Sequence, residues 1–362
     1  MKELMKKAAE FKMPAVAITD HGNLFGAIEF YQEAQRAGVK PIIGCEVYVA
    51  PGSHKDRPPS RRESAYHFTL LAENETGYRN LVKLVTAAHL DGFHYAPRID
   101  KEMLAARSEG LIGLSGCLAG EINSAIQSNN IEKAKQSAAE YRDILGAENF
   151  FLELHDHGME EQKMCNAALV QIARDLGVGL VAANDVHFLR RSDHEAHDVM
   201  LCIGTGKMVQ DESRMHYLPE LYFKSPAEMR QVFRDFPEAI TNTLHIGERC
   251  HLDLEFGSSK YPEYPAPAGK TREGYLRELC YQGLRARYGE RATADSELTR
   301  RLEYELGVLE KQGSLVISSS FGISFISRRK KGSRLVPDAA RLQARSLRLS
   351  LASRTSIRFS SA

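Results

Sequence analysis

The sequence predicts an α/β fold whose strands run mostly parallel, either closed into a barrel or arranged as a doubly wound sheet. Short apolar runs alternate with longer amphipathic stretches over residues 2–250. Several apolar runs are followed by glycine and by a residue that can bind a metal or act in catalysis, as Ile18 is followed by His21 and Gly22. Alternating strands and helices imply parallel strands joined by crossover helices, and chemistry in such folds collects at the strand ends.

The spacing of the apolar residues places the individual elements. Apolar residues at every third or fourth position indicate helices, whereas short continuous apolar runs indicate buried strands. The predicted strands cover residues 14–18, 39–49, 66–72, 111–114, 149–154 and 178–183. The predicted helices cover residues 2–12, 25–37, 76–89, 131–144, 159–176, 193–202, 226–235 and 237–250.

A Pro- and Gly-rich stretch, residues 262–269, marks a domain boundary. Two charged helices rich in Glu, Arg and Leu are expected behind it, over 271–288 and 294–312. We therefore expect a first domain over 1–262 and the incomplete start of a second domain over 270–313.

The composition is that of a globular cytoplasmic protein. The chain has 362 residues, of which 43% are hydrophobic and 26% are charged. No apolar run reaches membrane-spanning length, and the first residues lack the apolar core of a signal peptide. The six cysteines are scattered without paired CxxC spacing, which indicates reduced thiols. We expect neither a membrane partner nor a disulfide framework.

The last 49 residues, 314–362, differ from the rest of the chain in charge and composition. They hold ten of the 48 Lys and Arg residues and one of the 47 acidic residues, so 38 basic and 46 acidic side chains remain in residues 1–313. Ser, Arg and Leu, the amino acids with six codons each, supply 27 of these 49 residues. A basic nucleic-acid-binding arm and a disordered segment translated out of frame both explain this bias, and we favour the second.

Six side chains at the ends of predicted strands form a candidate metal site. Asp185 and His187 are two residues apart, so on an extended backbone both side chains would face the same way and share a metal. Imidazole and carboxylate ligands suit zinc, manganese or iron, and clusters of them serve phosphoester hydrolysis. A lone histidine or cysteine would more often be a packed core residue. The candidate ligands are His21, Glu46, His67, Cys117, Asp185 and His187.

Other histidines favour structural explanations. In the triplet His155-Asp156-His157, which closes a strand and precedes a helix, we expect Asp156 or His157 to cap that helix, with metal binding as the alternative. His194 and His197 lie with Glu195 on a predicted helix, and we expect them to be solvated.

Five segments carry a family resemblance: residues 17–27, 41–49, 74–78, 114–117 and 184–187. They resemble the N-terminal part of the alpha-subunit family of bacterial DNA polymerase III. That part is a polymerase-and-histidinol-phosphatase (PHP) domain. The similarity extends from about Lys2 to Gly313 and is specific, because several long motifs occur in the same order.

The resemblance implies a distorted β/α barrel of the PHP type over 1–262 and the first helices of a polymerase palm over 270–313. In metal-binding members, the positions matching the six candidate residues are ligands of a cluster of divalent ions, here zinc, manganese or magnesium. The implied chemistry is that of a metal-dependent phosphoesterase or 3′–5′ exonuclease, with DNA synthesis by the following palm. The implied partners of the full-length parent are DNA, deoxynucleotides and other polymerase III holoenzyme subunits, including a proofreading exonuclease.

The chain departs from the family pattern at both ends. The family opens with a strand bearing an HxH motif and then an Asp, whereas this chain starts at the next helix, so six of the nine usual ligand positions remain. The resemblance stops at Gly313, before the catalytic aspartates of the palm. We therefore expect a fragment with a barrel lacking its first strand, weakened metal binding and little or no turnover.

Two other functions stay open at this point. The domain could be a non-catalytic scaffold that docks a proofreading subunit, although retention of six ligand positions argues against it. It could also be a free-standing histidinol-phosphatase-like hydrolase. Against this, the helices over 271–312 match the sequence that follows the PHP domain in the polymerase family. Substrate tests would separate these functions.

Overall fold

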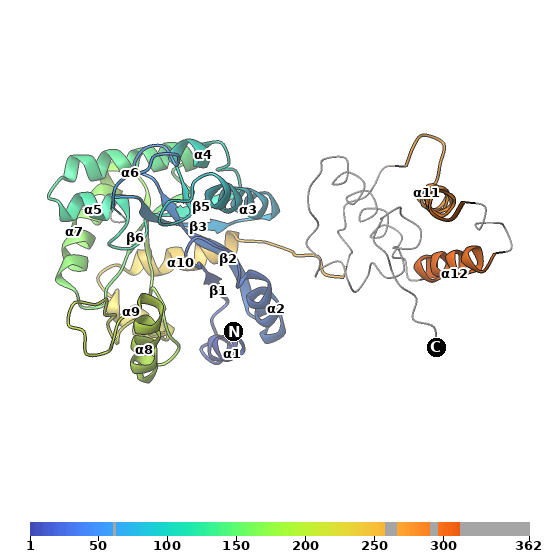
Figure 1. Ribbon diagram of the computed structural model, residues 1–362. Coiled ribbons are helices and arrows are strands. Elements are labelled where there is room, and N and C mark those ends of the chain that lie inside the picture. The colour runs from blue at the N-terminus through green and yellow to red at the C-terminus, as the bar shows by residue number, and fades with distance from the viewer. Residues whose placement is uncertain (61–62, 258–265, 290–295, 312–362) are drawn as a thin grey trace. The chain divides into compact units, whose positions relative to one another are not determined.

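The computed structural model describes residues 1–60, 63–257, 266–289 and 296–311, and the chain divides into two compact units, Met1–Leu254 and Glu255–Ala362. Figure 1 shows a curved sheet inside the first unit, with helices on its outer side. This arrangement is a half-barrel, and it confirms the predicted α/β class. In the second unit, the described residues form a pair of helices.

The sheet of the first unit has the order β1-β2-β3-β5-β6-β7, and β4 pairs with β2. Every described pairing is parallel except the two pairings of β3, which runs against both β2 and β5. All the other strands therefore point in one direction. The strands are β1 (Ala15–Ile18), β2 (Lys40–Val49), β3 (Tyr66–Ala72), β4 (Arg98–Ile99), β5 (Leu111–Leu114), β6 (Phe150–Leu154) and β7 (Gly179–Ala182).

The reversal of β3 is the main feature that the β-α alternation does not predict. The connection between β2 and β3, residues 50–65, contains no helix among its described residues. Adjacent strands joined without a crossover helix pair antiparallel, because a parallel pair needs a long connection from one end of the sheet to the other. The reversal places the amino end of β3 at the edge where the other strands have their carboxyl ends.

The predicted helices are present with end shifts of a few residues, whereas the short α4, α5 and η1 and the strand β4 were not predicted. Side-chain caps fix several helix starts, as where the Asn74 side chain accepts from the Gly77 backbone N–H. The helices are α1 (Lys2–Glu10), α2 (Ala27–Ala37), α3 (Glu75–Leu90), α4 (Lys101–Ala105), α5 (Glu121–Gln127), α6 (Ile131–Leu145), α7 (Glu160–Leu176), the 3-10 helix η1 (Arg191–Asp193), α8 (His194–Thr205), α9 (Pro226–Val232) and α10 (Pro237–Arg249).

The largest core cluster lies between the sheet and helices α3 to α7. Phe68 of β3 stacks on Tyr141 of α6 with ring centroids 4.3 Å apart, and both side chains are buried. Burying an aromatic side chain of this kind contributes roughly 1.5–3 kcal/mol. A second cluster packs α1 and α2 beside β1, so the strand that leads to His21 rests on two helices.

In the second unit, α11 (Arg272–Tyr288) packs against α12 (Glu297–Lys311) through buried Leu276, Leu284 and Leu306. Arg277 of α11 pairs with Glu303 and Glu310 of α12. The predicted boundary at residue 262 and the predicted disordered tail, 314–362, both lie outside the described residues.

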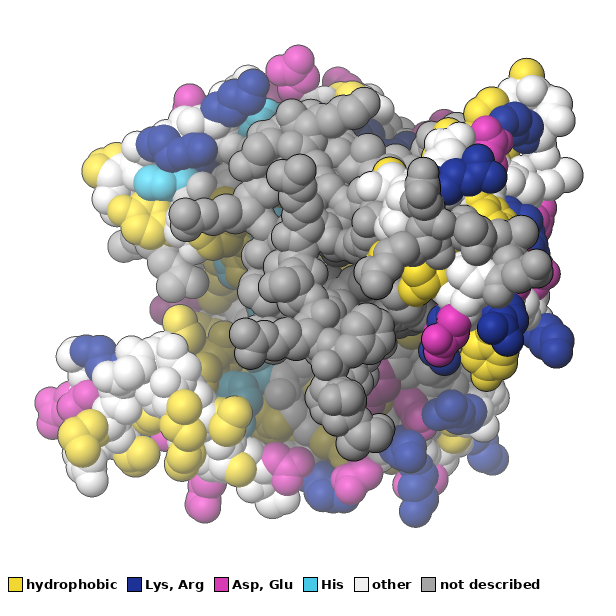
Figure 2. Space-filling model, turned by 45° about the vertical axis from the view of Figure 1, so that its right-hand side comes forward, with side chains coloured by type: hydrophobic (Ala, Val, Ile, Leu, Met, Phe, Trp, Pro, Cys, Tyr) yellow, Lys and Arg dark blue, Asp and Glu magenta, His cyan; other side chains and the backbone are white. Residues whose placement is uncertain are grey.

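None of the helices that the structure describes is long and apolar enough to cross a bilayer. On the coloured surface in Figure 2, Lys and Arg side chains are interspersed with Asp and Glu side chains. Mixed charges of this kind give little long-range attraction for a polyanion.

Candidate metal centre

The strand directions bring the candidate ligands to one edge of the sheet. His21 follows β1, Cys117 follows β5, and Asp185 follows β7, so all three lie beyond carboxyl ends that point the same way. His67 is the second residue of β3, and its strand starts at that edge because it is reversed. The carboxyl ends of parallel strands are where α/β folds place ligands.

Glu46 is the centre of the first group of ligands. The Nδ1 atoms of His21 and His67 each lie 2.7 Å from the same oxygen, Oε1 of Glu46. One possible ligand atom from each of these residues lies within 4.8 Å of the other two. We call these three residues the strand group, because backbone pairing holds all of them.

Backbone contacts explain why the strand group is ordered. Glu46 pairs with Thr69 in the β2–β3 ladder, and its carbonyl accepts from the Gly22 backbone N–H at 2.8 Å. Gly22 has φ +66°, and a Cβ there would lie 2.7 Å from Pro97 Cγ, so this turn requires glycine. The His21-Gly22 motif is therefore a tight turn that places the imidazole beside Glu46.

Cys117 extends the strand group. Its Sγ lies 3.5 Å from Nδ1 of His67. The preceding Gly116 has φ +79°, and a Cβ there would lie 2.8 Å from the His67 carbonyl oxygen. Close backbone approach at Gly116 thus brings the thiol to the histidine.

Asp185 and His187 form the second group, which we call the loop group because it lies in residues 183–188, after β7. Asp185 Oδ1 lies 3.7 Å from His187 Nδ1, which also lies 2.9 Å from the Asp185 carbonyl oxygen. The two side chains are neighbours as expected, but the expected reason is wrong. Asp185 has φ +48°, so a left-handed turn and not an extended strand joins them.

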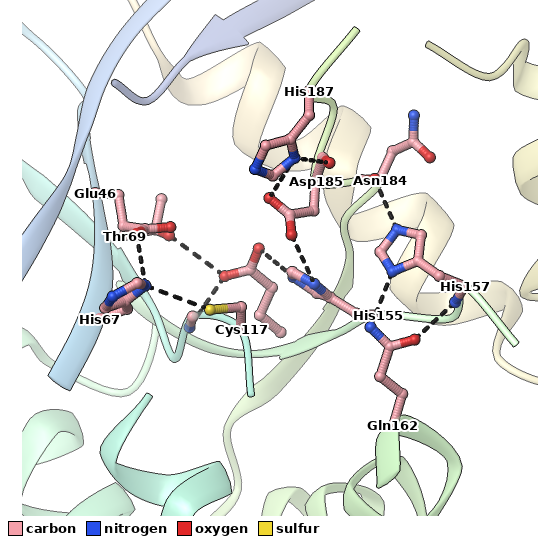
Figure 3. A network of polar contacts seen from close by, with 12 residues as sticks. Glu46, His67, Thr69, Cys117, His155, His157, Gln162, Asn184, Asp185 and His187 are labelled. Atoms are coloured by element: carbon pink, nitrogen blue, oxygen red, sulfur yellow. Dashed lines mark hydrogen bonds and ion pairs between the residues drawn. The ribbon is translucent and has the colours of Figure 1, made fainter. Parts of the chain in front are cut away.

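The two groups face each other across the site. The ring centroids of His21 and His187 are 6.2 Å apart, and those of His21 and His67 are 6.1 Å apart. Figure 3 shows Glu46, His67 and Cys117 on one side and Asp185 and His187 on the other. All six predicted residues therefore lie around one site, although only the strand group is as compact as a metal site requires.

The charges of the site are coupled. Burial raises the pKa of Glu46, but hydrogen bonds from His21 and His67 lower it more, to about 2. The hydrogen bond to Glu46 correspondingly raises the pKa of His21. Burial raises the pKa of the Cys117 thiol, and the nearby carboxylates add to this effect. Without a metal, the protein therefore holds a charged Glu46 beside a His21 ring whose protonated form is favoured, and a neutral thiol.

The triplet at residues 155–157 is not a helix cap, so that prediction is wrong. The N-cap of α7 is Met159, whose side chain makes no capping bond, and Asp156 Oδ1 accepts from the Gly158 backbone N–H. His155 and His157 are buried and face the loop group. Burial lowers the pKa of His155, but the charge and hydrogen bond of Glu153 raise it more, to about 9.

Two residues of α8 that were expected to be solvated are half-buried instead. His194 Nε2 lies 2.8 Å from the Tyr217 carbonyl oxygen, and the His197 ring packs against Tyr217. Tyr217 in turn packs against His187 with ring centroids 4.5 Å apart. Glu195 is exposed as expected. Nothing in the spacing of these residues predicts the contact, because Tyr217 comes from the irregular segment after α8.

Comparison with known proteins identifies the class first. Residues 1–157 match the family model of the PHP domain, so the chain carries a PHP domain. The match includes His21, Glu46, His67 and Cys117 and ends before Asp185 and His187.

The more specific relatives are alpha subunits of DNA polymerase III. The chain is 40% identical to that of Treponema pallidum over 314 residues, which are 85% of this chain and 26% of the relative. It is 42% identical to that of Borreliella burgdorferi over 315 residues (86% and 27%) and 44% identical to that of Thermus aquaticus over 289 residues (77% and 24%). The chain spans about a quarter of the length of these relatives, and the resemblance inferred from its motifs is confirmed.

Proposed function

We propose that the strand group and the loop group together hold divalent metal ions and that the site hydrolyses phosphodiesters, as a 3′–5′ exonuclease on DNA. The observation that carries the proposal is the convergence of two imidazole Nδ1 atoms on one oxygen of Glu46. Two imidazoles and one carboxylate at one point form the kind of three-ligand set that catalytic zinc sites use.

The residues of the site fit such ions. The six side chains offer imidazole nitrogen, carboxylate oxygen and a thiol, a set that suits zinc or manganese better than magnesium. Glu46 and His187 are mostly buried, with side-chain exposures of 10% and 15%, whereas His21 is half exposed, so the site opens to solvent on the His21 side. A substrate can reach the ligands from there.

A bound divalent metal would polarise the phosphoester and bring the pKa of a coordinated water toward neutrality. The protein's own groups supply the remaining requirements. Glu46 and Asp185 contribute negative charge that would balance the ions, and the imidazoles would bind as neutral nitrogen ligands. The ring of Tyr217 covers His187 and shields that side of the site from water.

We further propose that the chain acts within a replicative DNA polymerase alpha subunit, a nucleotidyltransferase that elongates DNA in the bacterial cytoplasm. The support is the identity of about 40% to such subunits over most of the chain. In this proposal the PHP domain covers 1–262, and 270–313 begins the polymerase palm. The partners of the parent would be DNA, deoxynucleotides and other holoenzyme subunits, including a proofreading exonuclease.

The test combines metal binding with substrate choice. Manganese and zinc are titrated calorimetrically into the chain and into Glu46→Gln, and the loaded proteins receive single-stranded DNA labelled at either end or a small phosphate ester. We expect binding that Glu46→Gln weakens at least about 100-fold, because the substitution removes the central charge. Because six of the nine family ligand positions are present, we expect any metal-stimulated loss of the 3′ label to be slow, and we expect the same substitution to abolish it.

The matched control is Glu121→Gln. Glu121 is as buried as Glu46, with 12% of its side chain exposed, but it pairs with Lys101. Metal affinity should be unchanged in this variant. Cleavage of the small ester without cleavage of DNA would contradict the exonuclease proposal and indicate a free-standing phosphatase. Metal binding without turnover of either substrate would indicate a non-catalytic scaffold.

A further inference from the structure

The histidine triplet after β6 has no role in the proposed ligand set, yet both of its imidazoles are buried. His155 is 6% exposed and His157 is 7% exposed. Burying two imidazoles is costly unless each finds polar partners. The partners of both rings lead to the loop group, as Figure 3 shows.

His155 lies between two carboxylates. Its Nε2 is 2.9 Å from Oε1 of Glu153, and its Nδ1 is 3.8 Å from Oδ2 of Asp185. The Nδ1 atom is buried and has no hydrogen-bond partner among the described residues. The Asp185 carboxylate lies just beyond hydrogen-bond distance of this nitrogen, and a small shift of the Asp185 side chain would close the hydrogen bond.

Glu153 fixes the His155 ring and the strand group at the same time. Its second oxygen, Oε2, accepts from the Gly116 backbone N–H at 3.0 Å and lies 3.5 Å from the Thr69 hydroxyl. Gly116 precedes Cys117, and Thr69 pairs with Glu46 in the sheet. One buried carboxylate thus links the position of His155 to the backbone that carries the other ligands.

His157 holds the backbone just before Asp185. The backbone N–H of His157 donates to Oε1 of Gln162 at 2.7 Å. The Gln162 amide NH₂ therefore faces Nδ1 of the His157 ring, at 2.9 Å. Nδ1 therefore accepts, and the proton on Nε2 is donated to the Asn184 carbonyl at 2.9 Å. This assignment follows from the hydrogen-bond network, because the Gln162 oxygen is committed to a backbone donor.

The segment that these two rings contact has an unfavourable backbone conformation at Asp185. Asp185 has φ +48°, a region that costs a non-glycine residue of order 1 kcal/mol or more. Such a turn persists when surrounding contacts determine it, and here one ring contacts the residue before the turn while the other faces its carboxylate.

We propose that His155 and His157 are positioning residues that hold the Asp185 carboxylate toward the metal site, His157 through the Asn184 carbonyl and His155 through the carboxylate itself. The consequence for metal binding depends on the proposed function above. Groups that orient a ligating residue typically change metal affinity by about 10–100-fold when they are removed.

The first test needs no metal. Hydrogen exchange of the peptide containing residues 183–188 is measured in the chain, in His155→Gln and in His157→Leu. We expect at least about threefold faster exchange in both variants, because local opening of the turn becomes easier. Exchange equal to that of the parent chain in both variants would overturn the proposal.

The second test distinguishes positioning from general damage. An asparagine amide occupies roughly the place of Nδ1 and a glutamine amide roughly the place of Nε2. His155→Asn keeps a donor toward Asp185, whereas His155→Gln keeps only the contact with Glu153. We expect manganese affinity to fall about tenfold or more in His155→Gln and clearly less in His155→Asn. The reverse order would contradict the proposal.

The matched control is His54→Gln, which removes the group at Nδ1. His54 also pairs with a largely buried carboxylate, with Nδ1 2.5 Å from Asp100, and its carbonyl accepts from the Arg57 and Arg98 side chains, away from residues 183–188. Its loss should lower the melting temperature without changing exchange at 183–188 or metal affinity. If the parent chain binds no manganese but the exchange effect is present, the metal function fails and the positioning role stands.

Discussion

The strand group and the loop group reach the same site by different physical means. Backbone hydrogen bonds of β2 and β3 fix Glu46 and His67, and a glycine turn fixes His21. Side chains of neighbouring elements hold Asp185 instead, in a turn whose backbone is unfavourable for an aspartate. The comparison suggests that the strand group gives the site its stability, whereas the loop group is where mutations can change metal binding at little cost to the fold.

The largest expected effect concerns the charge of Glu46 in the strand group. Its pKa is about 2 in the folded protein, against an ordinary value of 4.5. Because the folded pKa is lowered, the associated stability is present above pH 4.5 and is lost as the pH falls toward 2. A difference of this size corresponds to about 3 kcal/mol.

The measurement is denaturant unfolding of the metal-free chain and of Glu46→Gln at several pH values in the acid range. The stability advantage of the parent chain over the variant should shrink by about 3 kcal/mol as the pH falls through that range. Two stability curves that stay parallel would show that Glu46 is not held by its histidines.

The second prediction tests close backbone packing in the strand group. Gly116→Ala introduces a Cβ 2.8 Å from the His67 carbonyl oxygen at a φ of +79°. We expect it to lower the free energy of unfolding by about 2 kcal/mol or more. Gly177→Ala is the control, because Gly177 has φ +65° with open space around it, and its cost of about 1 kcal/mol is that of the backbone conformation alone. Equal losses of unfolding free energy in the two variants would show that contact with the His67 carbonyl oxygen does not destabilise Gly116→Ala.

The smallest effect on stability is expected in the loop group. Asp185→Gly relieves the unfavourable φ of +48° while it removes the carboxylate, so the free energy of unfolding should change by less than about 1 kcal/mol. Metal affinity should nevertheless fall sharply in calorimetry. Lys12→Gly, at φ +54°, provides the same backbone change outside the site and should leave metal binding intact. A large loss of stability in Asp185→Gly alone would mean that the loop group is part of the structural core.

Much of the fold could be predicted because the apolar spacing is regular. β3 and β5 have the predicted bounds, and most helix ends differ by a few residues. The direction of β3 could not be predicted in this way, since apolar spacing places a strand without orienting it. That direction matters for the site, because it brings His67 to the edge where His21 and Cys117 lie.

The candidate residues could be found because each lies at or near the end of a strand, but their contacts could not be predicted. The spacing of Asp185 and His187 indicated a pair, yet the turn at Asp185 is held by His155 and His157, which lie in the loop after another strand, β6. One feature of the sequence pointed to this support. Glu153 and His155 are two residues apart at the end of an apolar strand, so their side chains share a face and neither could be buried there without a polar partner.

The central claim is that the strand group and the loop group form one metal site. Crystals of the chain soaked in manganese, measured at a wavelength where manganese scatters anomalously, test it directly. The account predicts an anomalous peak bounded on one side by Glu46 and His67 and on the other by Asp185 or His187. A map with no peak there, or with manganese bound by one group while the other points away, would contradict it.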